Sequence, residues 1–135
     1  MLLTGMYAAV TADRIPYKNP TGGEFPILAW YSVLPESNLT PQRYAELRNA
    51  GFNISFSHFA SAAQAAEGLK ACKGTGVKLM MMCPEIEANT AEVVNRFKDD
   101  EMVAGWFLRD EPTAHGFKAL REFRDRVYEA DRNHT

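Results

Sequence analysis

The sequence predicts an α/β fold in which helices cover a parallel β-sheet. Four strand-like apolar runs begin near Ile27, Phe52, Val77 and Val103, so they recur at intervals of 25, 25 and 26 residues. The runs are apolar on both strand faces, which is typical of strands in buried parallel sheets. Helix-like segments separate them, and this alternation indicates four successive βα units.

The segments between the strands carry the chemistry of helix starts and stops. A threonine followed by proline is typical of an N-cap before the first helical residue. Two other starts have the spacing of a capping box, in which a Gln or Glu stands three residues after the N-cap. Glycines stand where helix C-caps belong, just before the next strand. The residues concerned are Thr40-Pro41, Ser61 with Gln64, Asn89 with Glu92, Gly51 and Gly76.

Apolar positions with a helical period mark four helices between and after the strands. They are Tyr44 and Leu47; Ala62, Ala65, Ala66, Leu69 and Cys72; Val93, Val94 and Phe97; and Phe117, Leu120 and Val127. Residues 1–24 break this rhythm, because they combine Pro16, Pro20, Gly22 and Gly23 with polar residues. We therefore expect an N-terminal arm or capping loop over 1–24 and four βα units over 25–135.

Two parallel architectures fit four βα units. A doubly wound sheet usually carries a glycine-rich phosphate loop after its first strand, and the stretch Trp30–Glu36 contains none. A full (β/α)8 barrel takes about 250 residues, so four units amount to half of one. The sequence thus predicts the N-terminal half of a barrel, a (βα)4 unit with a four-stranded parallel sheet and its helices outside.

Aromatic and charged residues recur where the four strands end. In (β/α)8 barrels the chemistry lies at these C-terminal strand ends. Aromatic faces pack on sugar rings and carboxylates accept hydrogen bonds from hydroxyls, so this set suits a neutral, polyhydroxylated ligand. In strand order the residues are Trp30 and Tyr31; His58; Glu85 and Glu87; and Arg109, Asp110 and Glu111.

The fourth strand and its end, Gly105-Trp106-Phe107-Leu108-Arg109-Asp110-Glu111-Pro112, resemble the retaining (β/α)8 glycoside hydrolases whose fourth strand ends in Asn-Glu-Pro. The resemblance covers roughly residues 25 to 130, mostly as the rhythm of the elements. It implies that Glu111 is the general acid/base, with Asp110 in place of the asparagine whose amide donates to the sugar 2-hydroxyl. Asp110 offers only acceptors unless it is protonated.

The resemblance also implies what a half-barrel lacks. Retaining hydrolysis needs a second carboxylate about 5 Å from the acid as nucleophile, and in this family it follows the seventh strand. We therefore expect no glycosidase turnover from the 135 residues alone. Substrate-side roles are expected for Asp110, His58, Trp30, Tyr31 and Glu85, and no cofactor is implied.

Other interpretations stay open at this point. Asp110-Glu111-Pro112-Thr113 also fits a plain loop, with Thr113 as helix N-cap. His115 and His134 are expected to be exposed helix residues. The chain also fits a non-catalytic carbohydrate-binding or self-assembling half-barrel, because unpaired strand edges near 27–33 and 103–109 invite pairing into a homo-oligomer. A third alternative is a small flavodoxin-like domain with a fifth strand from residues 1–24.

Composition excludes several classes of function. The 135 residues carry 15 Lys+Arg against 17 Asp+Glu, a net charge of −2 that argues against nucleic-acid binding. The longest apolar runs are strand-sized, far below the roughly 18 residues of a membrane span. Cys72 and Cys83 have no metal-site spacing, so no metal is expected. The first residues lack the pattern of a secretory signal, although a parent resembling bacterial polysaccharide-degrading enzymes would be periplasmic or secreted.

Overall fold

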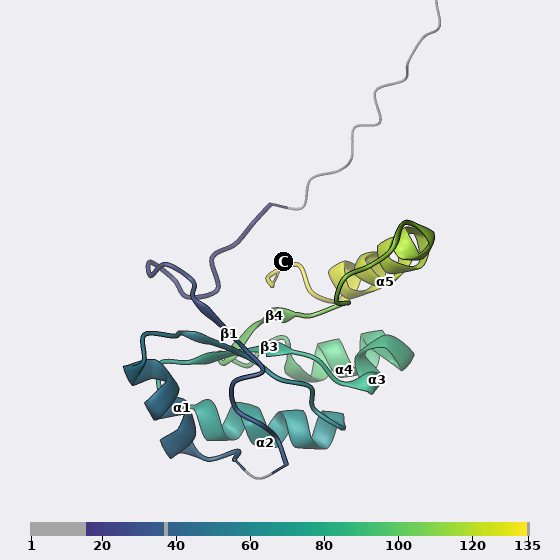
Figure 1. Cartoon of the computed structure of the whole chain (residues 1–135). Coiled ribbons are helices and arrows are strands. Elements are labelled where there is room, and N and C mark those ends of the chain that lie inside the picture. Colours follow the sequence, from purple (N-terminus) through teal and green to yellow (C-terminus); the bar gives the residue numbers. More distant parts are fainter. Residues whose placement is uncertain (1–15, 37, 135) are drawn as a thin grey trace, which may run out of the picture.

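The computed structural model describes residues 16–36 and 38–134 and shows an α/β fold (Figure 1). A four-stranded, all-parallel sheet alternates with helices along the chain. The elements are β1 Leu28–Trp30, α1 Pro41–Asn49, β2 Ile54–Phe56, α2 Ala62–Cys72, β3 Lys78–Met81, α3 Pro84–Ala88, α4 Thr90–Phe97, β4 Val103–Trp106, the 3-10 turn η1 Ala114–Gly116, and α5 Phe117–Ala130.

The strand order confirms the predicted (βα)4 arrangement. The sheet runs β1-β2-β3-β4, so each strand pairs with its neighbour in sequence. The pairing is in parallel register, with Leu28 opposite Ile54 and Ile54 opposite Lys78. A doubly wound sheet reverses its strand order at a switch point, and the consecutive order here is that of half a barrel. The topology therefore does not support a flavodoxin-like domain.

Local side-chain chemistry sets the starts of α1 and α2 as predicted. The Thr40 hydroxyl accepts the Arg43 N–H at 3.4 Å, and the Ser61 hydroxyl accepts the Gln64 N–H at 3.2 Å. The Gln64 side chain reaches back and accepts the Ala60 N–H at 2.8 Å. Each bond satisfies a backbone donor that has no partner inside its helix.

The capping box predicted at Asn89 is wrong. Asn89 is the N-cap of α4, but its side chain makes no capping hydrogen bond. Its backbone N–H instead donates to the Glu85 carbonyl at 2.7 Å and closes α3, a short helix that the sequence analysis did not predict. Because Asn89 ends one helix and begins the next, its backbone conformation differs from the extended one that a capping box requires.

The hydrophobic core lies between the sheet and the helices. Leu79, Met81 and Val103 of the sheet belong to one cluster of buried residues that also contains side chains of all five helices. Helix α2 lies so close to its neighbours at Gly68 that a Cβ there would stand 2.8 Å from the ring of Phe59, in the loop after β2, and 3.2 Å from Leu79 of β3. Leu28 alternates with the buried Ala29 and therefore lies on the opposite face of the sheet, where its side chain is exposed.

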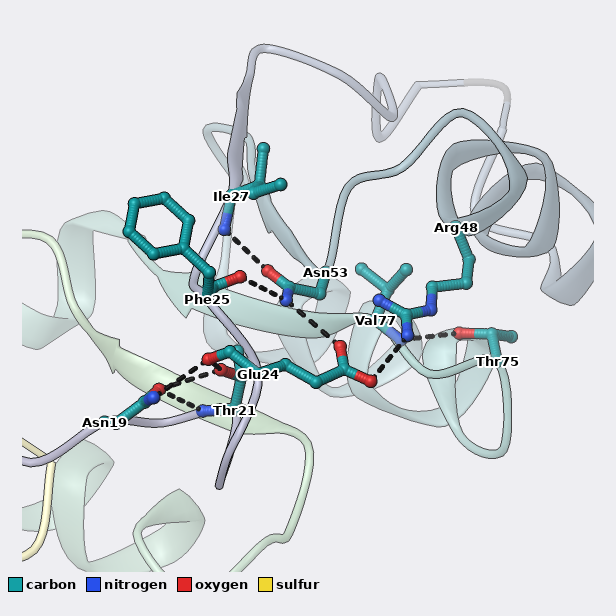
Figure 2. A network of polar contacts seen from close by, with 9 residues as sticks. All are labelled: Asn19, Thr21, Glu24, Phe25, Ile27, Arg48, Asn53, Thr75 and Val77. Carbon is teal, nitrogen blue, oxygen red and sulfur yellow. Dashed lines mark hydrogen bonds and ion pairs between the residues drawn. The ribbon is translucent and has the colours of Figure 1, made fainter.

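A polar network fastens the arm to the N-terminal ends of the strands (Figure 2). The buried Asn53 side chain accepts the Ile27 N–H at 2.7 Å and donates to the Phe25 carbonyl at 2.9 Å. Glu24 accepts from Asn53 and forms an ion pair with Arg48 at 2.8 Å. The bonds from Arg48 and Asn53 hold the pKa of Glu24 below its usual value. Residues 16–24 contain no helix or strand, and the rest of the expected arm, 1–15, lies outside the described residues.

A buried carboxylate, Asp131, binds the residues that follow α5 to β4. Asp131, which is 2% exposed, accepts the Trp106 indole N–H at 2.8 Å and the Asn133 N–H at 2.7 Å. It also accepts the backbone N–H of His134 at 3.2 Å and contacts Nδ1 of the same residue at 2.7 Å. His134 therefore lies beyond α5 and is largely buried, which corrects the expectation of an exposed helix residue.

Candidate functional site

An aromatic cluster lies where the strands end. The ring centroids of Trp30 and Phe56 are 4.5 Å apart, and those of Phe56 and Phe107 are 4.3 Å apart. Trp30 also meets Phe107 edge-on at 5.4 Å. The two Trp30 distances fall within the range of favourable aromatic contacts, and the Phe56 and Phe107 rings lie slightly closer than that range. Residues at the ends of β1, β2 and β4 thus form one continuous aromatic surface, called here the aromatic cluster.

The aromatic cluster has a buried base and exposed rings above it. Phe56 is completely buried, whereas Trp30 is 47% and Tyr31 44% exposed. The Tyr31 hydroxyl lies 2.9 Å from Nε2 of His58, in hydrogen-bond contact, and His58 is itself exposed. The site therefore offers ring faces and a hydroxyl–imidazole pair to a ligand from solvent.

Two residues at these strand ends have an unusual backbone. Tyr31 has φ 48° and Glu111 has φ 40°, and they are the non-glycine residues with positive φ in the part of the chain that the structure describes. The left-handed region costs a non-glycine residue on the order of 1–2 kcal/mol. Strained residues of this kind concentrate at functional sites, because tertiary structure holds them in place. Both lie at sequence positions where chemistry was expected.

Charged groups surround the same edge of the sheet. Arg109, after β4, forms an ion pair with Glu87 of α3 at 3.5 Å. Asp110 and Glu111 follow in the exposed loop between β4 and η1. The loop carries its acidic residues toward solvent just before Thr113, the N-cap of η1, whose side chain makes no capping bond.

Glu85 lies in a different environment. Its Oε1 accepts the backbone N–H of Ala62 at 3.1 Å, so it satisfies a donor in the first turn of α2. This hydrogen bond lowers the pKa of Glu85 below its usual value. The geometry gives Glu85 a positioning role, holding α3 against the start of α2.

The structure thus brings together Trp30, Tyr31 and His58 of the expected site. The sequence analysis missed Phe56 and Phe107, which form the base of the cluster. The register pairs Trp30 with Phe56, and residues opposite one another on neighbouring strands point to the same face. An aromatic at the end of a second strand, in register with Trp30, was the available signal.

No protein-family model matches this sequence, and neither curated proteins nor solved structures give a significant match. Within residues 16–36 and 38–134, no three His, Cys, Asp or Glu side chains gather in a way that could hold a metal ion. Over the same residues, no helix has the length and apolar character that crossing a membrane demands.

Proposed function

We propose that the C-terminal edge of the sheet binds a neutral carbohydrate, and that in a complete barrel Glu111 donates the proton in hydrolysis of a glycosidic bond. The observation that carries this proposal is the aromatic cluster, whose rings at Trp30 and Tyr31 are held half-exposed over a buried base. Sugar rings expose apolar C–H faces that pack on aromatic rings, while their hydroxyls need polar partners.

The polar groups beside the rings supply such partners. The Tyr31 hydroxyl and the His58 imidazole can each donate or accept, depending on the imidazole tautomer. Carboxylates also accept hydrogen bonds from hydroxyls, and those of Asp110 and Glu111 are exposed in the loop that follows β4. Because the groups of the cluster interlock through ring contacts and the Tyr31–His58 contact, little ordering is needed when a ligand binds.

The catalytic part of the proposal rests on the position of Glu111 after β4 and on the resemblance of Asp110-Glu111-Pro112 to the Asn-Glu-Pro that ends the fourth strand of the hydrolases. A retaining mechanism requires a second carboxylate about 5 Å away. In the hydrolases that the sequence resembles, the nucleophile follows the seventh strand. The four strands described here would therefore supply the proton donor and the sugar contacts, but not the nucleophile. We expect these 135 residues to bind sugar without hydrolysing it.

Replacing Trp30 with alanine tests the binding site. We expect Trp30→Ala to weaken binding about tenfold or more, since loss of one stacking ring costs at least ~1.4 kcal/mol. Isothermal titration calorimetry against a panel of neutral hexasaccharides built from glucose, xylose, mannose or galactose measures the change. The matched control is Phe117→Ala, which removes an exposed aromatic from the start of α5. Equal loss in both variants, or no binding by the unmodified chain, contradicts the proposal.

Glu111→Gln separates binding from chemistry. The variant keeps the size of the side chain, so we expect it to bind the same hexasaccharide with similar affinity. Reducing-sugar release by the 135-residue chain is expected to stay at background. Hydrolysis by the pure protein that disappears in Glu111→Gln would show that the chain needs no further carboxylate, and would overturn this part of the account.

A further inference from the structure

Two neighbouring aromatic residues, at the last position of β4 and directly after it, face opposite sides of the sheet. Trp106 belongs to the core on the helix side, where Asp131 accepts its indole N–H. Phe107 belongs to the aromatic cluster on the other side, where its ring lies 4.3 Å from that of Phe56. Val103 shares the helix-side core with Trp106, although it stands three residues earlier. Residues at an odd spacing lie on opposite faces of a regular strand, so the alternation of β4 is broken between Val103 and Trp106.

A β-bulge in β4 accounts for this break. Leu79 of β3 pairs with Val103, and the following Met80 pairs with Gly105. Ala104 lies between the two pairs as the extra residue of β4. In a bulge, two residues of one strand stand opposite one residue of its partner. Every side chain of β4 after Ala104 therefore points to the face opposite the one that regular alternation would give it.

The contacts beyond the bulge agree with this register. A Cβ on Gly105 would lie 3.3 Å from Sδ of Met80, so Gly105 and Met80 share a face of the sheet. Met80 is in register with Phe56, the buried base of the aromatic cluster. Residues opposite one another on neighbouring strands point to the same face. Phe107 returns to this face because it stands two residues after Gly105.

We propose that Ala104 is a positioning residue of the candidate site, because the bulge that it forms makes Phe107, and not Trp106, the ring that completes the aromatic cluster. The importance of this choice for sugar binding rests on the proposed function. With regular alternation from Val103, the indole of Trp106 would point into the cluster and the ring of Phe107 toward the helices. Bulges next to functional sites redirect side chains in this way.

The two rings suit the faces that the bulge gives them. A buried indole N–H needs a hydrogen-bond acceptor, and Asp131 supplies one on the helix side. A phenyl ring has no polar group, and that of Phe107 contacts the rings of Trp30 and Phe56. The opposite arrangement would move the indole N–H of Trp106 away from Asp131. The buried carboxylate would then have one donor fewer, which is unfavourable.

Deletion of Ala104 from the whole chain tests the proposal, since it removes the extra residue and the bulge together. The paired residues on either side keep their partners on β3, so we expect the variant to fold with Trp106 and Phe107 on their present faces. Two signals in nuclear magnetic resonance spectra measure this. The indole N–H of Trp106 should remain protected from exchange with water by Asp131, and the ring of Phe107 should show a nuclear Overhauser effect to Trp30.

The matched control is deletion of Ser55 from the middle of β2, which pairs regularly with both neighbouring strands. This deletion would turn Phe56 toward the helices, because a shift of one residue inverts every later side chain of a regular strand. We expect the Ser55 variant to lose its fold, as measured by circular dichroism, whereas the Ala104 variant keeps it. For a sugar that the unmodified chain binds, the Ala104 variant should keep the dissociation constant within about threefold.

The proposal would be overturned if deletion of Ala104 inverted the strand, so that the Trp106 indole lost its protection and its ring contacted Trp30. It would also be overturned if Val103 and Trp106 of the unmodified chain showed nuclear Overhauser effects to opposite faces of the sheet. That second measurement decides the matter where the Ala104 variant does not fold. Neither measurement needs a sugar, so a failure here is distinct from a failure of the carbohydrate proposal, which the Trp30→Ala titration tests.

Discussion

Asp131→Ala is expected to lower the free energy of unfolding by about 2–4 kcal/mol, because it removes the acceptor of a buried network. Trp106 would keep an indole N–H inside the protein with no partner, and the backbone N–H groups of Asn133 and His134 would lose theirs. Urea unfolding followed by circular dichroism measures the change. The control is Asp125→Ala, which removes an exposed carboxylate of α5 that pairs with Arg124 and is expected to cost below ~1 kcal/mol.

The same carboxylate predicts a dependence of stability on pH. Burial by itself raises the pKa of Asp131, but hydrogen bonds from Asn133, Trp106 and His134 outweigh it and hold the pKa below its usual value. Because the pKa of Asp131 is lower in the folded than in the unfolded protein, its ionised carboxylate stabilises the fold at pH values above the unfolded pKa. This stabilisation is lost as pH falls through the folded pKa.

The Asp131→Asn variant tests whether the Asp131 carboxylate causes a loss of stability as pH falls. The amide cannot titrate, so the variant should lose less stability than the unmodified chain between about pH 5 and pH 2. Equal acid sensitivity in the two proteins would mean that the Asp131 carboxylate is not hydrogen-bonded in the folded state as described.

Phe56→Ala is expected to lower the free energy of unfolding by as much as Asp131→Ala or more. Phe56 is completely buried and contacts the rings of Trp30 and Phe107. Removing a buried phenylalanine ring typically costs about 3–5 kcal/mol, because a cavity remains. The variant should also loosen Trp30 and Tyr31, so sugar affinity should fall with stability. Chemical unfolding and calorimetry measure the two effects.

The same substitution at Phe117 is the control for stability. That ring is exposed at the start of α5, so Phe117→Ala is expected to change the free energy of unfolding by less than about 1 kcal/mol. If the two variants have the same free energy of unfolding, Phe56 is not the packed base of the aromatic cluster.

The elements that local chemistry determines were predictable from the sequence. The four apolar runs contain the four strands, and Thr40 and Ser61 cap their helices as expected. Gly51 follows the C-cap of α1 with positive φ, as predicted, where a side chain would be strained. Gly76 is not the C-cap glycine of α2, because that helix ends at Cys72 and the glycine after its C-cap is Gly74. The features that were predicted correctly depend on residues close in sequence, and for that reason a single sequence shows them.

Features that depend on distant residues were missed. Helix α3 has a proline start and early acidic residues, but it is too short to show a helical period. The base of the aromatic cluster depends on the register between β1 and β2 and on the ring of Phe107 beyond β4. The His134 side chain is largely buried because it contacts Asp131, which also accepts the indole N–H of Trp106 in β4. No local pattern reveals such a contact.

The most direct test of the proposed sugar site uses the two tryptophans of the chain, Trp30 and Trp106. Their indole N–H resonances in a ¹H–¹⁵N spectrum can be assigned with Trp30→Phe, and followed while a neutral hexasaccharide from the panel is added. The account predicts that the Trp30 resonance shifts and broadens, whereas that of Trp106, held by Asp131, stays in place. A shift of Trp106 alone would place the ligand in the apolar cavity that Trp106 lines together with Tyr128 of α5 and Tyr17. No shift of Trp30 with any sugar would contradict the account.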